Sequence, residues 1–458
     1  MMGAGLLRES KGLSGRRIRR LTGVLLAAAA MLPVGGAVAQ STYGPAAPAR
    51  ARAAQAPVAL ARPGGVSAEL ADAAGRASET YPSVRAGRLA AQAAGSDTDA
   101  AKWLRFPSVS VEALAFTGDH RLVGDRDFTT SIVVDQPLYA GGRIGGSIKR
   151  AQAMQLLREV QVDETRRDVA LRVTQAYFDL ARAARRTVLL SAGLEEHRRL
   201  VDSISRRVEQ EISPRADLEL AQTRTAQVAQ DFAASEAQRA AALQQLRELV
   251  GDPNYDPGAV PRYDAAVHHP DPQGAIDQAL TCDPRRQRFQ AEALVARADV
   301  KVAQSSIMPK LSAQYSHNEI TGNRVGLVLR AQTDGGLSQL SAAEGARLRR
   351  DASDVQIAVA ERELRETMAL DLLENVSMRD RIASNAAAAV GARAVTDSYQ
   401  RQFVAGRRTW LDVMNAVREA TGADIAQSDA EVAAMASAAR LLLRSCRWQP
   451  QAGETIPR

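Results

Sequence analysis

Apolar side chains recur every three or four positions through a long stretch of this chain, residues 142–211, which contains no proline. This spacing predicts a helix with one buried stripe. A second stretch of equal length, 336–405, also lacks proline. At 1.5 Å per residue each stretch predicts a rod of roughly 105 Å. The stripe expected in the first rod consists of Val173, Ala176, Leu180, Ala184, Val188, Val201, Ile204, Val208 and Ile212.

Each rod follows two short segments in which apolar and polar residues alternate. The second segment places Phe128, Ile132 and Val134 on one face, the third places Leu311, Ala313 and Tyr315, and the fourth places Val325, Leu327 and Leu329; the first, 109–116, alternates less regularly. Alternation predicts strands with one apolar face, as in a transmembrane barrel. The edge of a soluble sandwich alternates in the same way, but four short strands attached to such long helices cannot build a sandwich core.

The order of elements is written twice along the chain. Residues 70–113 align without a gap on 272–315, pairing Pro82 with Pro284 and Pro107 with Pro309. A pair of glycines follows the second strand segment of each copy: Gly141-Gly142 in the first copy and Gly335-Gly336 in the second. The paired prolines and glycines are separated by a nearly constant number of residues, which indicates an internal duplication.

The two rods end in related turns. EISPRADLELA around Asp217 corresponds to AGRRTWLDVMNA around Asp412, a shift of 195 positions, and a returning helix is expected after each turn, over 216–250 and 410–444. Each copy therefore predicts a helix, two strands, a very long helix, a turn and a shorter helix. We divide the chain into 1–39, 40–65 (a flexible segment), 66–250 (first repeat), 251–272 (a Pro- and Asp-rich linker), 273–447 (second repeat) and 448–458 (a tail).

The formal charge of +7 comes mainly from the first 39 residues, which contain RRIRR, an apolar run and the small-x-small sequence Ala37-Val38-Ala39. This pattern predicts a cleaved export signal that leaves Gln40 first. A membrane anchor would need an apolar run of about 20 residues, and this run is shorter. The remaining charges are interspersed and form no basic face, so a nucleic-acid partner is not expected.

The sequence contains no convincing catalytic or metal-binding motif. YAGGRIGGSIKR opens a helix but lacks the Lys-Ser/Thr end of a phosphate-binding loop, and is interpreted as a tight turn. The five histidines are scattered, and the adjacent pair His268-His269 is expected to be solvated. Cys282 and Cys446 could form one disulfide in an oxidising compartment, but two buried thiols are favoured. We expect no enzyme activity, no metal and no cofactor.

The strings DQPLYAGGRIGGSIKRAQA, ISPRADLELAQTR and AGRRTWLDVMNAVREA, within the duplicated frame, resemble the TolC-type outer-membrane factors, the export ducts of Gram-negative bacteria. The resemblance extends over about residues 66–447. It implies a mainly α fold with a small β part, in which three chains share a 12-stranded outer-membrane β-barrel that a periplasmic α-barrel continues. Glu211 departs from the family pattern because the first turn usually has glycine there, which leaves the shape of that tip open.

The resemblance also implies roles for residues near the two turns. Asp412 would form an acidic ring at the pore constriction, with Asn415 as a second, neutral ring, and Arg408 would bond to Asp217 and lock the entrance. Asp412 and Asp217 could instead serve only as carboxylates near helix N-termini. The segments between the strands, 118–127 and 320–323, are expected to face the cell exterior. The tips expected to dock an adaptor are formed by Ile212, Ser213, Pro214, Arg215, Gly406 and Arg407.

The function implied is that of a homotrimeric duct, in contact with outer-membrane lipid, for one-step (type I) secretion. Its partners would be a periplasmic adaptor protein, an inner-membrane ABC transporter and an exported protein cargo such as a toxin or adhesin. GRRTWLDVMNAVRE favours this function over its alternative, multidrug efflux. A periplasmic adaptor is a third possibility, but adaptors lack paired amphipathic strands in two repeats.

Overall fold

The computed structural model describes residues 62–115, 128–259, 261–272, 274–319, 322–332 and 336–450. They fall within one compact unit, Leu60–Arg458. The first repeat comprises α1 (Ala68–Thr80), α2 (Pro82–Trp103), β1 (Ser108–Ala115), β2 (Phe128–Tyr139), α3 (Arg143–Glu209) and α4 (Arg215–Val250). The second comprises α5 (Ala275–Cys282), α6 (Pro284–Ser305), β3 (Lys310–Asn318), β4 (Gly322–Arg330), α7 (Ser338–Val404) and α8 (Trp410–Arg444).

The predicted elements are all present, with one difference at the start of each repeat. We expected one helix before the strands, and the structure has two. Pro82 and Pro284 each stand first in a new helix, and the residues before them, Tyr81 and Asp283, have ψ angles of 134° and 121°. A residue before proline avoids the helical conformation, whereas proline suits the first helical position, so the helix breaks there.

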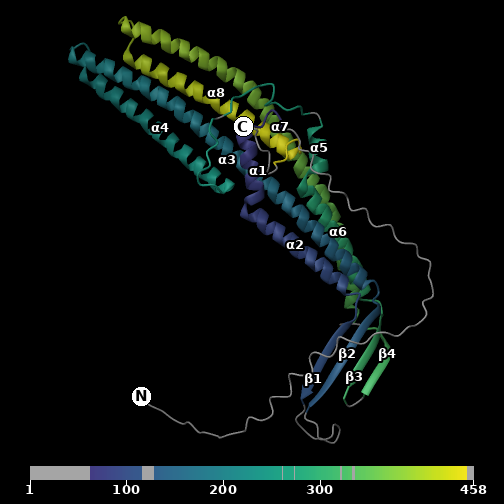
Figure 1. The fold of residues 1–458 in the computed structure, drawn as a ribbon. Coiled ribbons are helices and arrows are strands. Elements are labelled where there is room, and N and C mark those ends of the chain that lie inside the picture. Colours follow the sequence, from purple (N-terminus) through teal and green to yellow (C-terminus); the bar gives the residue numbers. More distant parts are fainter. Residues whose placement is uncertain are drawn as a thin grey trace, which may run out of the picture. The chain divides into compact units, whose positions relative to one another are not determined.

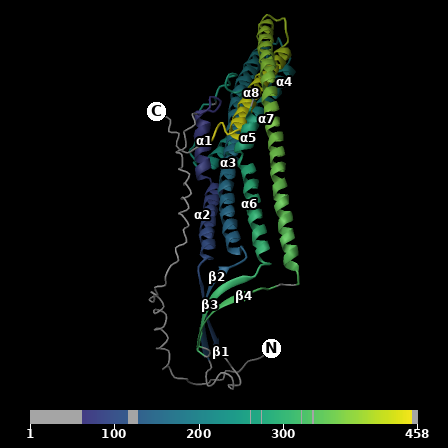
Figure 2. The ribbon, with the colours of Figure 1, turned by 90° about the vertical axis from the view of Figure 1, so that its right-hand side faces the viewer.

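The two rods form as single helices of 67 residues each, α3 and α7, which at 1.5 Å per residue are about 100 Å long. In Figures 1 and 2 the sheet lies at one end of these helices and the two turns lie at the other. Each rod packs on its own returning helix, α4 or α8, and α3 also packs on α6 and α8 of the other repeat. Among the described residues, no helix is both long and apolar enough to cross a membrane.

The four strands form one antiparallel sheet in the order β1-β2-β3-β4. Val111 lies opposite Ile132, Val134 opposite Tyr315, and Ala313 opposite Leu327. The predicted apolar positions therefore line up across all four strands on one face. The period-two interpretation is confirmed, including the less regular first strand.

The core consists of separate clusters along the bundle. The largest joins α1, α3 and the C-terminal half of α8, and includes Leu70, Val173 and Met435. A second lies near the turns and includes Ile204, Phe403 and Trp410. The stripe prediction for α3 holds for Val173, Ala176, Leu180 and Ile204, which are buried. It is wrong for Val188 and Ile212.

Val188 and Ile212 are 66% and 65% exposed. Val188 lines an open groove between α3 and α8, and Ile212 follows the end of α3, so neither meets a neighbouring helix. Helical periodicity identifies the face a helix can bury, but not how far along that face a partner extends.

Candidate functional site

The sheet exposes its apolar face and turns its polar residues to the other side. Val325 is 82% exposed, and the apolar face also carries Val109, Val111, Phe128, Ile132, Tyr315, Leu327 and Leu329. The opposite face carries Ser110, Ser131, Asp135, Gln314 and Ser316. Within the described chain β1 and β4 each pair on one side only. This sheet is therefore amphipathic and has two open edges.

The glycine pairs make the turns from sheet to rod. Gly141 and Gly142 have φ angles of 57° and 88°, and Gly142 precedes α3 as its N-cap. A side chain at Gly141 would place its Cβ 2.4 Å from the Met308 Cβ. Gly336 has a φ of 73°, while Gly335 lies outside the described residues. Left-handed backbone of this kind favours glycine, which explains the pair in terms of backbone geometry.

The two tips have the same backbone despite their different sequences. In the first turn Ile212 N–H donates to the Arg207 carbonyl (2.8 Å), and in the second Arg407 N–H donates to the Gln402 carbonyl (2.8 Å). Glu211 has a φ of 59°, where its counterpart Gly406 has 71°. The question left open by the missing glycine is thereby answered, because Glu211 adopts the left-handed conformation itself.

Close contacts join the two hairpins just behind the tips. The Arg207 guanidinium donates to the Phe403 carbonyl (3.1 Å) and lies 4.2 Å from the centre of the Phe403 ring. The apolar side chains of Ile204, Trp410 and Val413 are buried in the same region. The residues expected to dock an adaptor lie beyond these contacts, at or next to the helix ends. They are Ile212, Ser213, Pro214, Arg215, Gly406 and Arg407.

The expected entrance residues lie at the starts of the two returning helices, with Asp217 in the first turn of α4 and Asp412 in the first turn of α8. Thr409 caps α8: its hydroxyl accepts from the Asp412 N–H (3.2 Å) and donates to the Asp412 carboxylate (2.9 Å), so Asp412 lies in the first turn of the helix. Arg408 lies 3.7 Å from the Asp412 carboxylate and 4.2 Å from the centre of the Tyr399 ring. Asp217, in the first turn of α4, makes no ion pair with a described residue of this chain.

Asn415 is held by a residue that the sequence did not suggest. The Arg224 guanidinium of α4 donates from Nη1 to Asn415 Oδ1 on α8 (3.2 Å). This bond joins the first hairpin to the second at the height of the expected neutral ring. No signal in the sequence relates positions 224 and 415.

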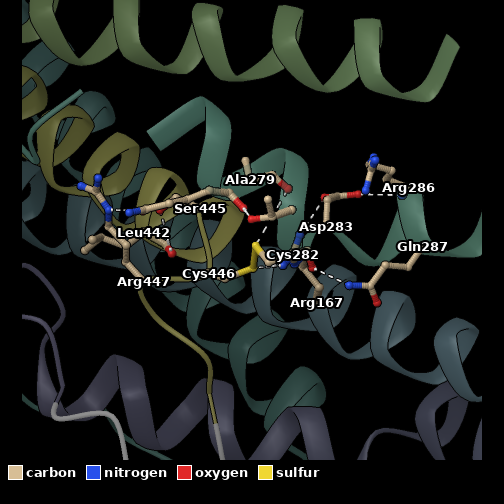
Figure 3. Close-up of a disulfide and its surroundings, with 12 residues drawn as sticks. Arg167, Ala279, Cys282, Asp283, Arg286, Gln287, Leu442, Ser445, Cys446 and Arg447 are labelled. Atoms are coloured by element: carbon tan, nitrogen blue, oxygen red, sulfur yellow. Dashed lines mark hydrogen bonds and ion pairs between the residues drawn. A yellow bond between two sulfur atoms is a disulfide. The ribbon is translucent and has the colours of Figure 1, made fainter. Parts of the chain in front are cut away.

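Cys282 and Cys446 form a disulfide, so the expectation of two unpaired thiols is wrong (Figure 3). The bond joins Cys282, the last residue of α5, to Cys446, which lies just beyond the C-cap Ser445 of α8. Cys446 has a φ of 57°, and its counterpart by the shift of 195 is Gly251, with 77°. The bridge therefore occupies a helix-ending position that glycine fills in the first repeat.

A buried ion pair lies against the disulfide. Arg167 of α3 donates to the Asp283 carboxylate (2.7 Å) and to Cys446 Sγ (2.7 Å), and the two charged side chains are only 14% and 10% exposed. Burial lowers the pKa of Arg167, and Asp283 opposes this shift. The ion pair and the disulfide together fasten the helix break at Pro284 to α3 and to the end of α8.

The linker is held against α7 by His268 and His269, which we expected to be solvated, so that expectation is wrong. His268 is buried, and its carbonyl accepts from the Asn375 amide (3.2 Å). The ring of His269 bonds to the same Asn375 (2.8 Å) and to Tyr263 (2.6 Å). Asn375 on α7 also reaches Ser437 on α8 (2.8 Å), so one amide holds the linker against both helices.

Residues 73–252 match the family described as outer membrane efflux protein. A membrane protein from Pseudomonas aeruginosa has a similar structure, with a TM-score of 0.73 at 18% identity over 83% of this chain and 92% of that one. The outer membrane protein VceC of Vibrio cholerae gives 0.71 at 15% identity over 82% and 96%. The CmeC outer membrane channel of Campylobacter jejuni gives 0.73 at 12% over 85% and 88%. No curated protein matches the sequence.

The fold is therefore that of an outer-membrane channel-tunnel, mainly helical with a small sheet. The resemblance to the TolC-type outer-membrane factors, which the family model describes as outer membrane efflux proteins, is confirmed. Members of this family are channels and not enzymes, and the expected location in the outer membrane agrees with its description.

Proposed function

We propose that three copies of this chain form one duct across the outer membrane and the periplasm. The amphipathic sheet with open edges at β1 and β4 carries this proposal. An unpaired backbone group in lipid costs several kcal/mol, so an open edge cannot persist in a membrane. Pairing β4 of one copy with β1 of the next closes a ring, and three copies supply twelve strands, a number found in such barrels.

The helices support the same assembly. In the first repeat α3 packs on its own α2 and α4 and also on α6 and α8 of the second repeat. Its counterpart α7 packs on α5, α6 and α8, and within the described residues it has no extensive contact with a helix of the first repeat. By the symmetry of the duplication, α2 and α4 of the next copy are the missing partners. The apolar side chains that α7 leaves exposed are Leu340, Leu348, Val355, Val359, Leu370, Leu373, Val376, Val390, Val395 and Val404.

Assembly can be tested on α7 itself. Replacing Leu370 and Leu373 together by glutamate places two charges on the proposed interface, and we expect the trimer to be lost while helical content remains. The matched control replaces both residues by methionine, which keeps the surface apolar. Light scattering and circular dichroism of the purified chain measure the two properties. A glutamate variant that remained trimeric would remove α7 from the interface.

We further propose that the duct serves one-step secretion, receiving an exported protein from an adaptor and an inner-membrane ABC transporter at its tips. The string GRRTWLDVMNAVRE supports this choice. Asp412 and Asn415 would line the constriction, and Arg408 would bond to Asp217 in the closed trimer. Planar-bilayer recording of Asp412→Asn should show a weaker preference for cations; unchanged selectivity would leave Asp412 only as a carboxylate near a helix N-terminus.

Drug efflux is the second candidate, and the description of the matching family as efflux proteins favours it. A strain lacking this gene separates the two functions. Secretion predicts the loss of one or a few proteins from the culture medium with unchanged drug sensitivity. Efflux predicts the opposite pattern. Complementation with Gly406→Val, which strains the second tip, should restore trimers in the outer membrane but not transport.

A further inference from the structure

A groove with a volume of about 340 Å³ lies between α3, α4 and α8, on the side of α8 that carries Asn415. Leu190, Val228, Met414 and Ile425 supply apolar surface to it. Arg186, Arg224 and Arg418 line it as well, one from each helix, together with a single carboxylate, Asp231. The groove thus combines apolar walls with an excess of positive charge.

None of the three arginines forms an ion pair with a described residue, whereas two nearby arginines do. On the other side of the α3–α8 contact, Arg185 pairs with Glu431 (2.9 Å) and Arg393 with Asp424 (2.6 Å). Arg186 and Arg418 form no ion pair with any described residue. The carboxylate of Asp429 pairs instead with Arg182 (3.9 Å); burial raises the pKa of Asp429, although the charge of Arg186 acts to lower it. Cationic side chains that outnumber the nearby carboxylates create a site for an anion.

Arg224 has unused hydrogen-bonding capacity. Its Nη1 bonds to the neutral amide of Asn415, while its Nε is buried and has no partner in the structure. A buried donor of a charged group that lacks an acceptor is costly, and such groups in native proteins call for an explanation. An anionic oxygen in the groove would provide that acceptor.

His197 is buried beneath these arginines, and its Nδ1 donates to the Gly193 carbonyl (2.9 Å). Burial lowers the pKa of His197, and the positive charges of Arg418 and Arg224 lower it further. The imidazole is therefore neutral near pH 7. The cations of the groove are the arginines alone, and the positive field does not depend on protonation of the histidine.

Space in the groove is preserved by Gly422. A glycine inside a helix costs about 1 kcal/mol relative to alanine, so its presence within α8 needs a reason. A Cβ at Gly422 would meet no atom within 4 Å, whereas at Gly193, where α3 meets α8, it would lie 2.7 Å from the Thr421 hydroxyl. Gly193 is explained by close packing, but Gly422 opens onto free volume.

We propose that this groove binds a small organic anion, a carboxylate or sulfonate attached to an apolar ring or short chain. The acidic group contacts Arg224 and Arg418, and the apolar part covers Met414 and Ile425. Each copy carries its own groove, so a trimer has three. The presence of three grooves in one duct rests on the proposed function, whereas the binding itself does not.

Titration calorimetry on the purified trimer in an uncharged detergent tests this proposal. The probe is 2-naphthalenesulfonate, and 2-naphthalenemethanol serves as its neutral counterpart. We expect saturable binding of one sulfonate per chain and at least about tenfold weaker binding of the alcohol, since a hydrogen bond to a charged group contributes that much or more.

Three variants identify the site. Arg418→Gln removes a charge and should weaken sulfonate binding at least about tenfold. Gly422→Leu keeps every charge but fills the space, and should abolish binding. Arg239→Gln makes the same charge change at an exposed position of α4 outside the groove and should change nothing.

Equal affinity for the two probes, or full binding by Gly422→Leu, would overturn the proposal. Conductance of the same preparations in planar bilayers reports on the duct separately. A conducting trimer that binds no sulfonate would contradict the groove alone, and a non-conducting chain that binds it would contradict the duct alone.

Discussion

The rods α3 and α7 have the same length and the same place in their repeats, yet they have opposite surroundings. α3 buries 22 of its residues and α7 only nine, while the returning helices reverse the order, with five buried in α4 and 17 in α8. Within one chain α3 and α8 meet at the centre, and α4 and α7 lie outside them. A duplicated sequence therefore does not produce duplicated environments, because only one of the two possible contacts between repeats can form inside a single chain.

The second difference concerns the ends of helices. The described residues include two non-glycine residues with positive φ, Glu211 and Cys446, and each is the repeat counterpart of a glycine, Gly406 or Gly251. Each repeat thus keeps glycine at one end of its returning helix and replaces it at the other. Exchanging residues between the repeats, or removing what one repeat has and the other lacks, should therefore change the stability of the chain.

The largest effect is expected from the disulfide, which has no counterpart in the first repeat. Closing a loop of 164 residues constrains the unfolded chain, so Cys446→Ser should lower the free energy of unfolding by about 2–5 kcal/mol. Cys446→Gly also loses the bridge but accepts the left-handed conformation, and should be more stable than the serine variant by about 1 kcal/mol. Urea unfolding measures both differences; equal stability of the two variants would contradict the role given to backbone conformation.

A smaller effect is expected at Asn375, whose counterpart in α3 is the buried Leu180. Asn375→Leu makes the rods alike at this position but leaves the groups of His268 and His269 without their partner. A buried polar group without a partner costs about 1–3 kcal/mol, which is the expected loss of stability. Thermal unfolding measures it, and Gln356→Leu, which replaces an amide by leucine at an exposed position of the same helix, is the control. A loss no larger than in the control would show that the linker is held by other contacts.

The burial of His268 predicts a dependence on pH. Burial lowers the pKa of His268, so the folded protein favours the neutral ring. The stability that His268 contributes is therefore present above the unfolded pKa of about 6.5 and is lost as the pH falls through the lower pKa of the folded state. Unfolding midpoints measured from pH 7.5 to 5 should fall less steeply in His268→Gln than in the parent chain. An equally steep fall would assign the effect to other groups, of which buried His197 is the first.

The smallest effect is expected at the tips, where Glu211 and Gly406 share one conformation. Glu211→Gly should stabilise the chain by about 1 kcal/mol, since a left-handed residue other than glycine carries a cost of this size. Gly406→Glu should destabilise it by a similar amount. Urea midpoints compare the variants, and an unchanged midpoint for Glu211→Gly would mean that contacts of the glutamate side chain offset the cost.

Local patterns in the sequence predicted the elements well, because they depend on periodicity and on residues close together in the chain. The rods, the strands and the correspondence between the residues of the two turns could all be predicted in this way. The breaks at Pro82 and Pro284 were also visible in the sequence, and the physical rule for the residue before proline would have predicted them.

Contacts between distant residues could not be predicted. Arg167 meets Asp283, Arg224 meets Asn415, and Cys282 meets Cys446 only because α3, α4, α6 and α8 pack together in three dimensions. Two cysteines in an exported chain were a signal for a disulfide, but their proximity depends on the fold. The burial of His268 likewise depends on where the linker lies against α7 and α8, which its proline-rich composition does not specify.

The Cys282–Cys446 bond also has a consequence for cleavage of the chain. It turns the segment from 282 to 446 into a covalent ring that contains α6, β3, β4, α7 and nearly all of the second repeat. A protease that cuts the backbone once within this ring leaves the two pieces attached until a reductant separates them. The first repeat has no such ring, so a single cut there, between β1 and β2 for example, leaves the two fragments joined by no covalent bond.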